Sequence, residues 1–185
     1  MGEQHKKHNR REHLNDFHLN VAGEYVYDGA LYACQSDDAK QRRSKRAVWG
    51  MAAILTVAVA AGGCIPAPGM QNCFYVLLPY LGEFLGAASV IWALAKLGMD
   101  WGTVREYNYK QSVAVLPVRT AVTAVFSLLG IVCELIFFFV NDHAGQTFFA
   151  LLYVLLKLIA LLSVLVLRAE IMQAEWDKLP KKNNS

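Results

Sequence analysis

The sequence predicts an all-α fold, a four-helix transmembrane bundle with both termini in the cytoplasm and a short polar N-terminal head. The first observation behind this prediction is composition. The chain of 185 residues is 55% hydrophobic and 18% charged, whereas a soluble domain is roughly 45–50% apolar and about 25% charged. Residues 1–46 hold nine of the 18 Lys and Arg and seven of the 15 Asp and Glu. The remainder is too apolar for a water-soluble globule, and a net charge of +3 gives no indication of nucleic acid binding.

The second observation is four long apolar stretches. A helix needs about 20 apolar residues to cross a ~30 Å hydrocarbon core. The stretches that qualify are residues 47–64, 74–97, 119–140 and 147–167. We therefore expect a cytoplasmic head at 1–46, a bundle at 47–168 and a cytoplasmic tail at 169–185, in which the fourth helix continues as far as Leu179. Because 46 mostly polar residues precede the first stretch, it does not resemble a signal peptide.

The third observation is the distribution of basic residues between the loops, which sets orientation. Five of the seven residues at 40–46 are Lys or Arg, and the middle loop holds Arg105 and Lys110. The loops at 65–72 and 141–146 contain neither Lys nor Arg. This asymmetry predicts cytoplasmic termini and a cytoplasmic middle loop, in a plasma membrane or a bacterial inner membrane.

Two cysteines flank the first of these uncharged loops. Cys64 and Cys73 would face the oxidising side of the membrane, where they could form a disulfide. Such a bond could contribute up to about 3 kcal/mol by the chain-entropy estimate. The alternative is two free thiols, because Pro66 and Pro68 can hold the ends of the loop apart.

The head contains a hairpin signal. Asp28-Gly29 stands between two β-prone triplets, which predicts a hairpin over residues 24–33. A single hairpin is only marginally stable, so it needs a partner. Candidates are the membrane surface, another subunit or the loop at 101–109. Four head histidines, His5, His8, His13 and His18, lack the Cys or clustered carboxylates of a metal site, and we expect neither a metal nor a cofactor.

The most informative feature is a set of three charged residues inside the predicted spans, which we call the trio: Glu83, Glu134 and Lys157. At 1.5 Å per residue they lie roughly 13, 9 and 15 Å from the outer surface, so all three share one half of the membrane.

Small and polar residues accompany the trio and allow close helix approach. The predicted helix-packing residues are Gly82, Gly86, Thr123, Ser127 and Gly130. The first span offers Ala52, Thr56 and Ala60 for the same purpose. The Gly82/Gly86 pair could alternatively mediate dimerisation.

Each charge at mid-span costs about 2.5–3.5 kcal/mol on insertion scales, which favours pairing within the bundle. The ionised trio has a net charge of −1. We expect Glu134 to pair with Lys157, because a short loop joins their helices, and Glu83 to be the carboxyl that binds a proton or a cation.

The motifs of hydrolases and nucleotide-binding enzymes are missing from the sequence, so an enzyme is not expected. The favoured interpretation is a small accessory or assembly subunit in which the trio fixes helix packing. The alternative is a proton- or cation-coupled transporter or channel that uses the trio. Both interpretations predict contact with the lipid bilayer and a homo- or hetero-oligomer with other membrane proteins.

Overall fold

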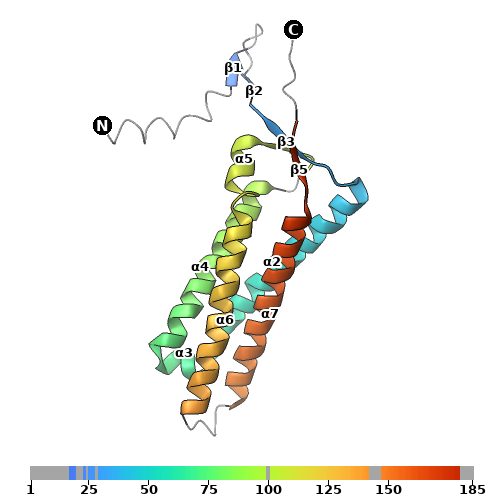
Figure 1. Ribbon diagram of the computed structural model, residues 1–185. Helices are drawn as coiled ribbons and strands as arrows, with labels where there is room; N and C mark the ends of the chain where they lie inside the picture. Colours follow the sequence, from blue (N-terminus) through green and yellow to red (C-terminus); the bar gives the residue numbers. More distant parts are fainter. Residues whose placement is uncertain are drawn as a thin grey trace, which may run out of the picture.

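Four long helices form the body of the protein. The computed structural model describes residues 17–19, 23, 25–27, 29–98, 101–141 and 147–179. The helices, which run side by side (Figure 1), are α2 Asp38–Cys64, α4 Phe74–Leu97, α6 Leu116–Val140 and α7 Thr147–Gln173. α2 packs on α7, α7 on α6 and α6 on α4, and a smaller α2–α4 contact closes the ring. The bundle therefore has one shared interior.

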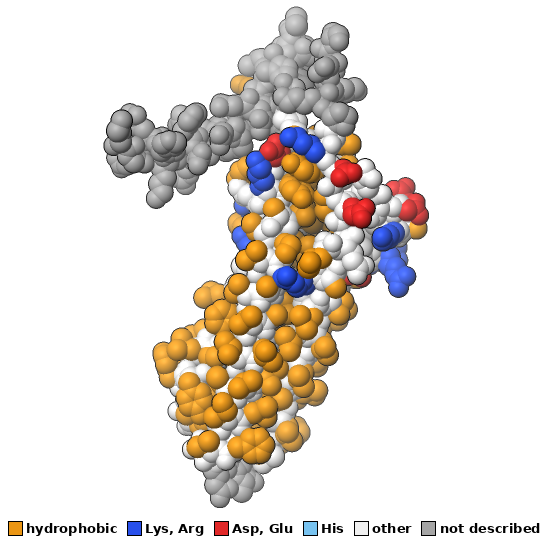
Figure 2. Space-filling view, viewed as in Figure 1, with side chains coloured by type: hydrophobic (Ala, Val, Ile, Leu, Met, Phe, Trp, Pro, Cys, Tyr) orange, Lys and Arg blue, Asp and Glu red, His pale blue; other side chains and the backbone are white. Residues whose placement is uncertain are grey.

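All four helices are long and apolar enough to cross a membrane. Leucine, valine and phenylalanine side chains point outward along α4, α6 and α7, and the visible face of the lower bundle is almost entirely apolar (Figure 2). Charged side chains gather at the opposite end, over the start of α2 and the loops (Figure 2). This is the surface of a membrane protein, because lipid tails solvate apolar side chains and charged groups need water.

Two of the helices, α2 and α6, begin earlier than the predicted apolar stretches, whereas α4 and α7 begin where those stretches do. α2 starts at Asp38 rather than Ala47, because its basic turns are rich in Lys, Arg, Gln and Ala, which are good helix formers. α6 starts at Leu116, and Pro117 lies in its first turn, where a missing N–H leaves no hydrogen bond unmade.

A short helix, α3 Pro68–Asn72, lies between α2 and α4 and contacts α4, α6 and α7. We call this end of the bundle the α3 end. All four cysteines are free in the structure, which therefore has the second of the two alternatives for Cys64 and Cys73. The two thiols are not bridged because the loop between them is not a simple turn. The helix α3 fills it, with Cys64 ending α2 and Cys73 capping α3.

A three-stranded antiparallel sheet covers the other end, which we call the sheet end. The central strand β3 Leu31–Cys34 pairs with β4 Thr103–Arg105 on one side and β5 Trp176–Lys178 on the other. Aromatic rings join this sheet to α5 Glu106–Gln111. Tyr32 stacks on Tyr109 with ring centroids 4.1 Å apart, and Trp176 lies 6.0 Å from Tyr109. Burial of these rings ties the head to the bundle.

Two predictions are wrong, one for the strand pairing of the head and one for the structure of the tail. Both β-prone triplets form strands, but β3 does not pair with β2 Tyr25–Tyr27 as a 24–33 hairpin requires. β2 pairs instead with β1 Phe17–Leu19. The loop at 101–109 was one of the three candidate partners, and its strand β4 pairs with β3. The last helix ends at Gln173 rather than Leu179, because the tail supplies β5 to the second edge of β3.

The buried face of α2 also differs from the prediction. Ala52 is buried, but Thr56 and Ala60 are exposed. The buried residues of this helix are Val48, Ala52, Leu55, Ala58, Val59 and Gly62. The stripe that faces the bundle interior therefore mixes larger apolar side chains with small residues.

Candidate functional site

The trio lies inside the bundle and is closed to solvent. α4 contributes Glu83, α6 contributes Glu134 and α7 contributes Lys157, with exposed fractions of 0%, 0% and 2%. In a globular protein such residues are seldom fully buried unless they are paired. The shared interior of the four helices therefore holds two acids and one amine.

Lys157 and Glu83 form a buried ion pair. The Lys157 ammonium donates a hydrogen bond to Oε2 of Glu83. The same ammonium lies 4.6 Å from the ring centroid of Tyr80 and 5.1 Å from that of Tyr153. Aromatic faces attract cations, so the two rings add to the stabilisation of the ammonium by the carboxylate.

The predicted pairing of Lys157 with Glu134 is therefore wrong, and so is the choice of Glu83 as the carboxyl without an amine. The reason lies in α6. A Cβ placed on Gly130 would lie 3.5 Å from Cε of Lys157, so the lysine stem crosses α6 where there is no side chain. The ammonium thereby reaches α4 and Glu83. Glu134 is one turn further along α6, toward the α3 end.

Glu134 has a different environment. Neither of its carboxylate oxygens makes a hydrogen bond of ordinary geometry with the described residues, although the backbone of Gly69 lies beside them. A Cβ on Gly69 would meet the Glu134 carboxylate and would lie 3.1 Å from Cδ1 of Phe137. The α3 helix thus covers Glu134 from the α3 end, and a larger residue at Gly69 would require the Glu134 carboxylate to move.

Unpartnered polar atoms are concentrated around the trio. Among the described residues, five buried side-chain nitrogen or oxygen atoms lack a hydrogen-bond partner. Four of them are Oε1 of Glu83, both oxygens of Glu134 and the hydroxyl of Tyr153. An unsatisfied buried polar group costs about 1–3 kcal/mol. Such a cluster has the chemistry to hold a proton, water molecules or a small hard cation, because all four atoms are oxygens.

The predicted packing residues lie at helix contacts within one chain. A Cβ on Gly82 would lie 2.5 Å from the Phe126 ring, and one on Gly86 would lie 2.6 Å from the hydroxyl of Thr123. The Gly82/Gly86 pair therefore lies at the α4–α6 contact within one chain. Ser127 donates a hydrogen bond of 3.3 Å to the backbone carbonyl of Lys157, which joins α6 to α7.

Tyr153 is predicted to share the packing face of the fourth span with Lys157, but sequence reasoning gave it no role at the charged site, and it missed Tyr80 and Gly69. Tyr80 precedes Glu83 by three residues and Tyr153 precedes Lys157 by four, so the helical period places each ring on the face of its charged partner. The Tyr80 hydroxyl also donates a 3.3 Å hydrogen bond to the carbonyl of Val59. Gly69 could not be found in this way, because its role depends on how α3 folds back over α6.

The head histidines give no metal site to describe. His5, His8 and His13 lie outside the described residues, as does the side chain of His18. Within the described part of the chain, no three His, Cys, Asp or Glu residues are placed to share a metal ion. Comparison with protein-family models, curated proteins and solved structures finds no match to this chain.

Proposed function

We propose that the protein is a small, non-enzymatic accessory or assembly subunit of a plasma or bacterial inner membrane, with both termini in the cytoplasm. The observation that carries this proposal is the complete burial of the Glu83–Lys157 pair within four apolar helices. A closed interior gives a substrate no route to the charges, so the pair's role is to fix which helix faces meet. The basic residues at 40–46 support the orientation.

The apolar exterior leaves the protein free to associate with other membrane proteins. The long exposed side chains of α4, α6 and α7 would contact lipid or a neighbouring subunit, as a second copy or a different chain. Nucleic acid is not a partner in this proposal, because the basic residues lie at the membrane surface.

The structural role can be tested by removing one charge or both. Glu83→Met leaves the Lys157 ammonium without its hydrogen-bonded carboxylate, and Lys157→Met leaves the Glu83 carboxylate without its amine. Each variant should destabilise the folded protein by about 3–5 kcal/mol. The double variant Glu83→Met/Lys157→Met should recover most of that loss, because an apolar pair can replace a buried ion pair. Unfolding in a series of denaturing detergent mixtures measures all three variants.

The double variant also distinguishes a structural role of the ion pair from a role in activity. If the pair only fixes packing, the double variant should assemble in cells like the wild type. A double variant as unstable as either single variant would contradict the proposal. So would a stable double variant that fails to assemble or to support growth.

A second candidate, a proton- or cation-coupled transporter or channel, is favoured by Glu134. With Lys157 committed to Glu83, the second carboxylate needs a proton or a cation to offset its charge in a medium of low dielectric constant. The unpartnered oxygens of Glu134 and Tyr153 would supply the ligands. In this alternative Glu134, rather than Glu83, is the group that exchanges.

Transport can be measured in sealed proteoliposomes. The alternative predicts that the wild type dissipates an imposed pH or Na⁺ gradient faster than protein-free vesicles, and that Glu134→Gln abolishes the difference. Gln keeps the shape of a protonated Glu but cannot release the proton. Gly50→Ala, in α2, adds a Cβ that meets no atom within 4 Å and should behave like the wild type. Identical rates with and without the wild-type protein would reject the transporter alternative.

A further inference from the structure

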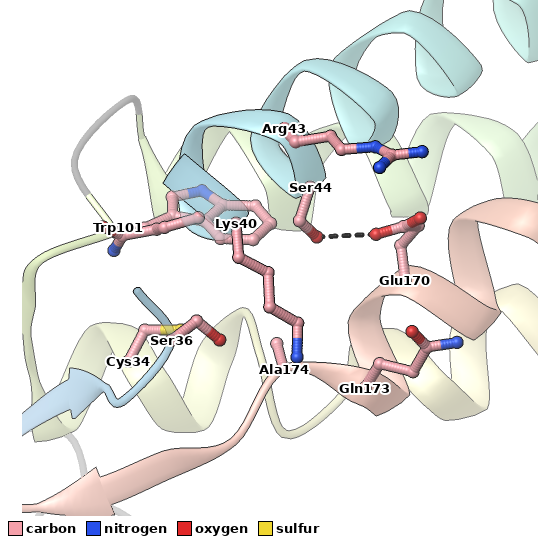
Figure 3. A pocket seen from close by; sticks show the side chains of 10 residues that line it. Cys34, Ser36, Lys40, Arg43, Ser44, Trp101, Glu170, Gln173 and Ala174 are labelled. Atoms are coloured by element: carbon pink, nitrogen blue, oxygen red, sulfur yellow. Dashed lines mark hydrogen bonds between the residues drawn. The ribbon is translucent and has the colours of Figure 1, made fainter. Parts of the chain in front are cut away.

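A polar cavity lies at the sheet end, apart from the trio. It has a volume of about 240 Å³ and lies between the start of α2, the end of α7, β3 and the segment that precedes β4 (Figure 3). Its lining includes Ser36, Lys40, Arg43, Ser44, Trp101 and Glu170. Lys40 extends from α2 across the cavity toward the end of α7, beside the Trp101 ring (Figure 3). Neither the sequence motifs nor the trio explains this arrangement.

The cavity is richer in donors than in acceptors. Lys40 and Arg43 make no ion pair with the described residues, although both line the cavity. Trp101 is 4% exposed, and its indole N–H is the fifth buried polar atom without a partner. Glu170 is the lone acid in the lining, and its Oε2 accepts a 2.8 Å hydrogen bond from the Ser44 hydroxyl. Two cations against one carboxylate leave a net positive site.

We propose that this cavity binds the phosphoryl group of a small phosphate ester. Arginine and lysine are the usual phosphate-binding side chains, and an indole N–H adds a neutral donor. The free oxygen of Glu170 would accept a hydrogen bond from a hydroxyl or ammonium group elsewhere on the ligand. The volume is below the roughly 300–1,000 Å³ of sites for drug-sized ligands, and it suits a phosphoryl group with a short polar substituent.

The position of the cavity allows the phosphoryl group to come from either of two kinds of ligand. α2 has 27 residues, so it is about 40 Å long and exceeds the ~30 Å hydrocarbon core. Its first turns, which carry Lys40 and Arg43, precede the apolar stretch at Ala47, so we expect them at the level of lipid headgroups. The phosphoryl group can therefore belong to an anionic phospholipid or to a soluble phosphate ester.

The test uses the full-length protein and two probes. Glycerol 3-phosphate is titrated into the protein in a neutral detergent, and vesicles of phosphatidylcholine with and without phosphatidylglycerol supply the lipid. Tryptophan fluorescence and thermal unfolding report binding in both arms. Saturable binding of glycerol 3-phosphate identifies a soluble ligand. A response to phosphatidylglycerol alone identifies the headgroup.

Variants of the lining residues test whether binding occurs in the cavity. Lys40→Gln and Arg43→Gln should each raise the half-saturation concentration about tenfold or more, because each removes a charged hydrogen-bond donor. Lys45→Gln removes the same charge from the same helix outside the cavity lining, and it should change that concentration less than about twofold. Absence of saturable binding in both arms would overturn the proposal. Equal weakening by Lys40→Gln and Lys45→Gln would overturn it as well, since that result indicates general charge attraction.

Discussion

Gly69 is the residue at which α3 meets the trio. Its missing side chain lets the backbone of α3 lie against the Glu134 carboxylate and the Phe137 ring. Phe137 is 3% exposed and Glu134 is 0% exposed, so a shift of either side chain would have to be accommodated inside the bundle. The fit of α3 over the bundle therefore depends on the absence of one methyl group.

Replacing Gly69 by Ala should loosen this contact. The added Cβ would lie 2.9 Å from Cδ of Glu134 and 3.1 Å from Phe137. Overpacking of this kind costs about 1–3 kcal/mol. We expect a lower unfolding temperature in detergent and faster reaction of the neighbouring Cys73 with a thiol reagent.

Gly50→Ala is the matched control. Gly50 lies in α2, and a Cβ there meets no atom within 4 Å. Because Ala favours a helix over Gly by up to about 1 kcal/mol, this variant should be neutral or slightly more stable. If Gly69→Ala unfolds at the same temperature as Gly50→Ala, then α3 does not rest on Glu134 as described.

The residue scale also shows the limit of prediction from sequence. Residue depths along the helices placed Glu83, Glu134 and Lys157 at overlapping levels, and the structure brings all three into one interior. Which acid meets the amine depends on the path of the Lys157 stem over Gly130. The helical period gives the face of a residue on its own helix, but it does not give the rotation of one helix against another.

At the scale of elements, the α4–α6 contact is the clearest case of close helix packing. Gly86 of α4 faces Thr123 of α6, and a Cβ on Gly86 would lie 3.3 Å from the Thr123 Cα. Gly130 of α6 also faces a neighbour, but its nearest atoms belong to the flexible Lys157 side chain at 3.5 Å or more. The two glycines look alike in sequence and differ in what a side chain would meet.

We therefore expect opposite outcomes for the same substitution. Gly86→Ala should lower stability by about 1–3 kcal/mol, because the backbone of α6 must move away. Gly130→Ala should be tolerated, because the added methyl makes an ordinary contact and helix propensity improves by up to about 1 kcal/mol. Unfolding of the two variants in the same detergent series measures the difference. Equal losses would show that α4 and α6 do not pack as closely as the structure describes.

Some helices and strands could be predicted from the sequence and others could not. The four spans were found because about 20 apolar residues in a row leave few alternatives to a membrane helix. The sheet was not, because β3 takes its partners from segments some 70 and 140 residues away, at Thr103–Arg105 and Trp176–Lys178. No local pattern specifies such pairing. The helix α3 was missed because its five residues are too few to show a period.

At the scale of the whole molecule, the two ends of the bundle differ in chemistry. The sheet end has the basic turns of α2, the sheet β4-β3-β5 and the phosphoryl-binding cavity that we propose. The α3 end, within the described residues, has α3 and carries no Lys or Arg. Because basic residues are retained on the cytoplasmic side, the proposed orientation has the sheet end in the cytoplasm.

The native cysteines test this orientation directly. Cys34 ends β3 at the sheet end, whereas Cys64 and Cys73 flank α3. A membrane-impermeant maleimide added to intact cells should label Cys64 and Cys73, and Cys34 should react only after the membrane is permeabilised. Treatment of half the sample with an impermeant reductant before labelling shows whether the Cys64 and Cys73 thiols are free in the cell. The double variant Cys64→Ser/Cys73→Ser should lose all labelling from outside. Labelling of Cys34 in intact cells would reverse the orientation, and it would place the proposed phosphoryl-binding cavity on the outer surface.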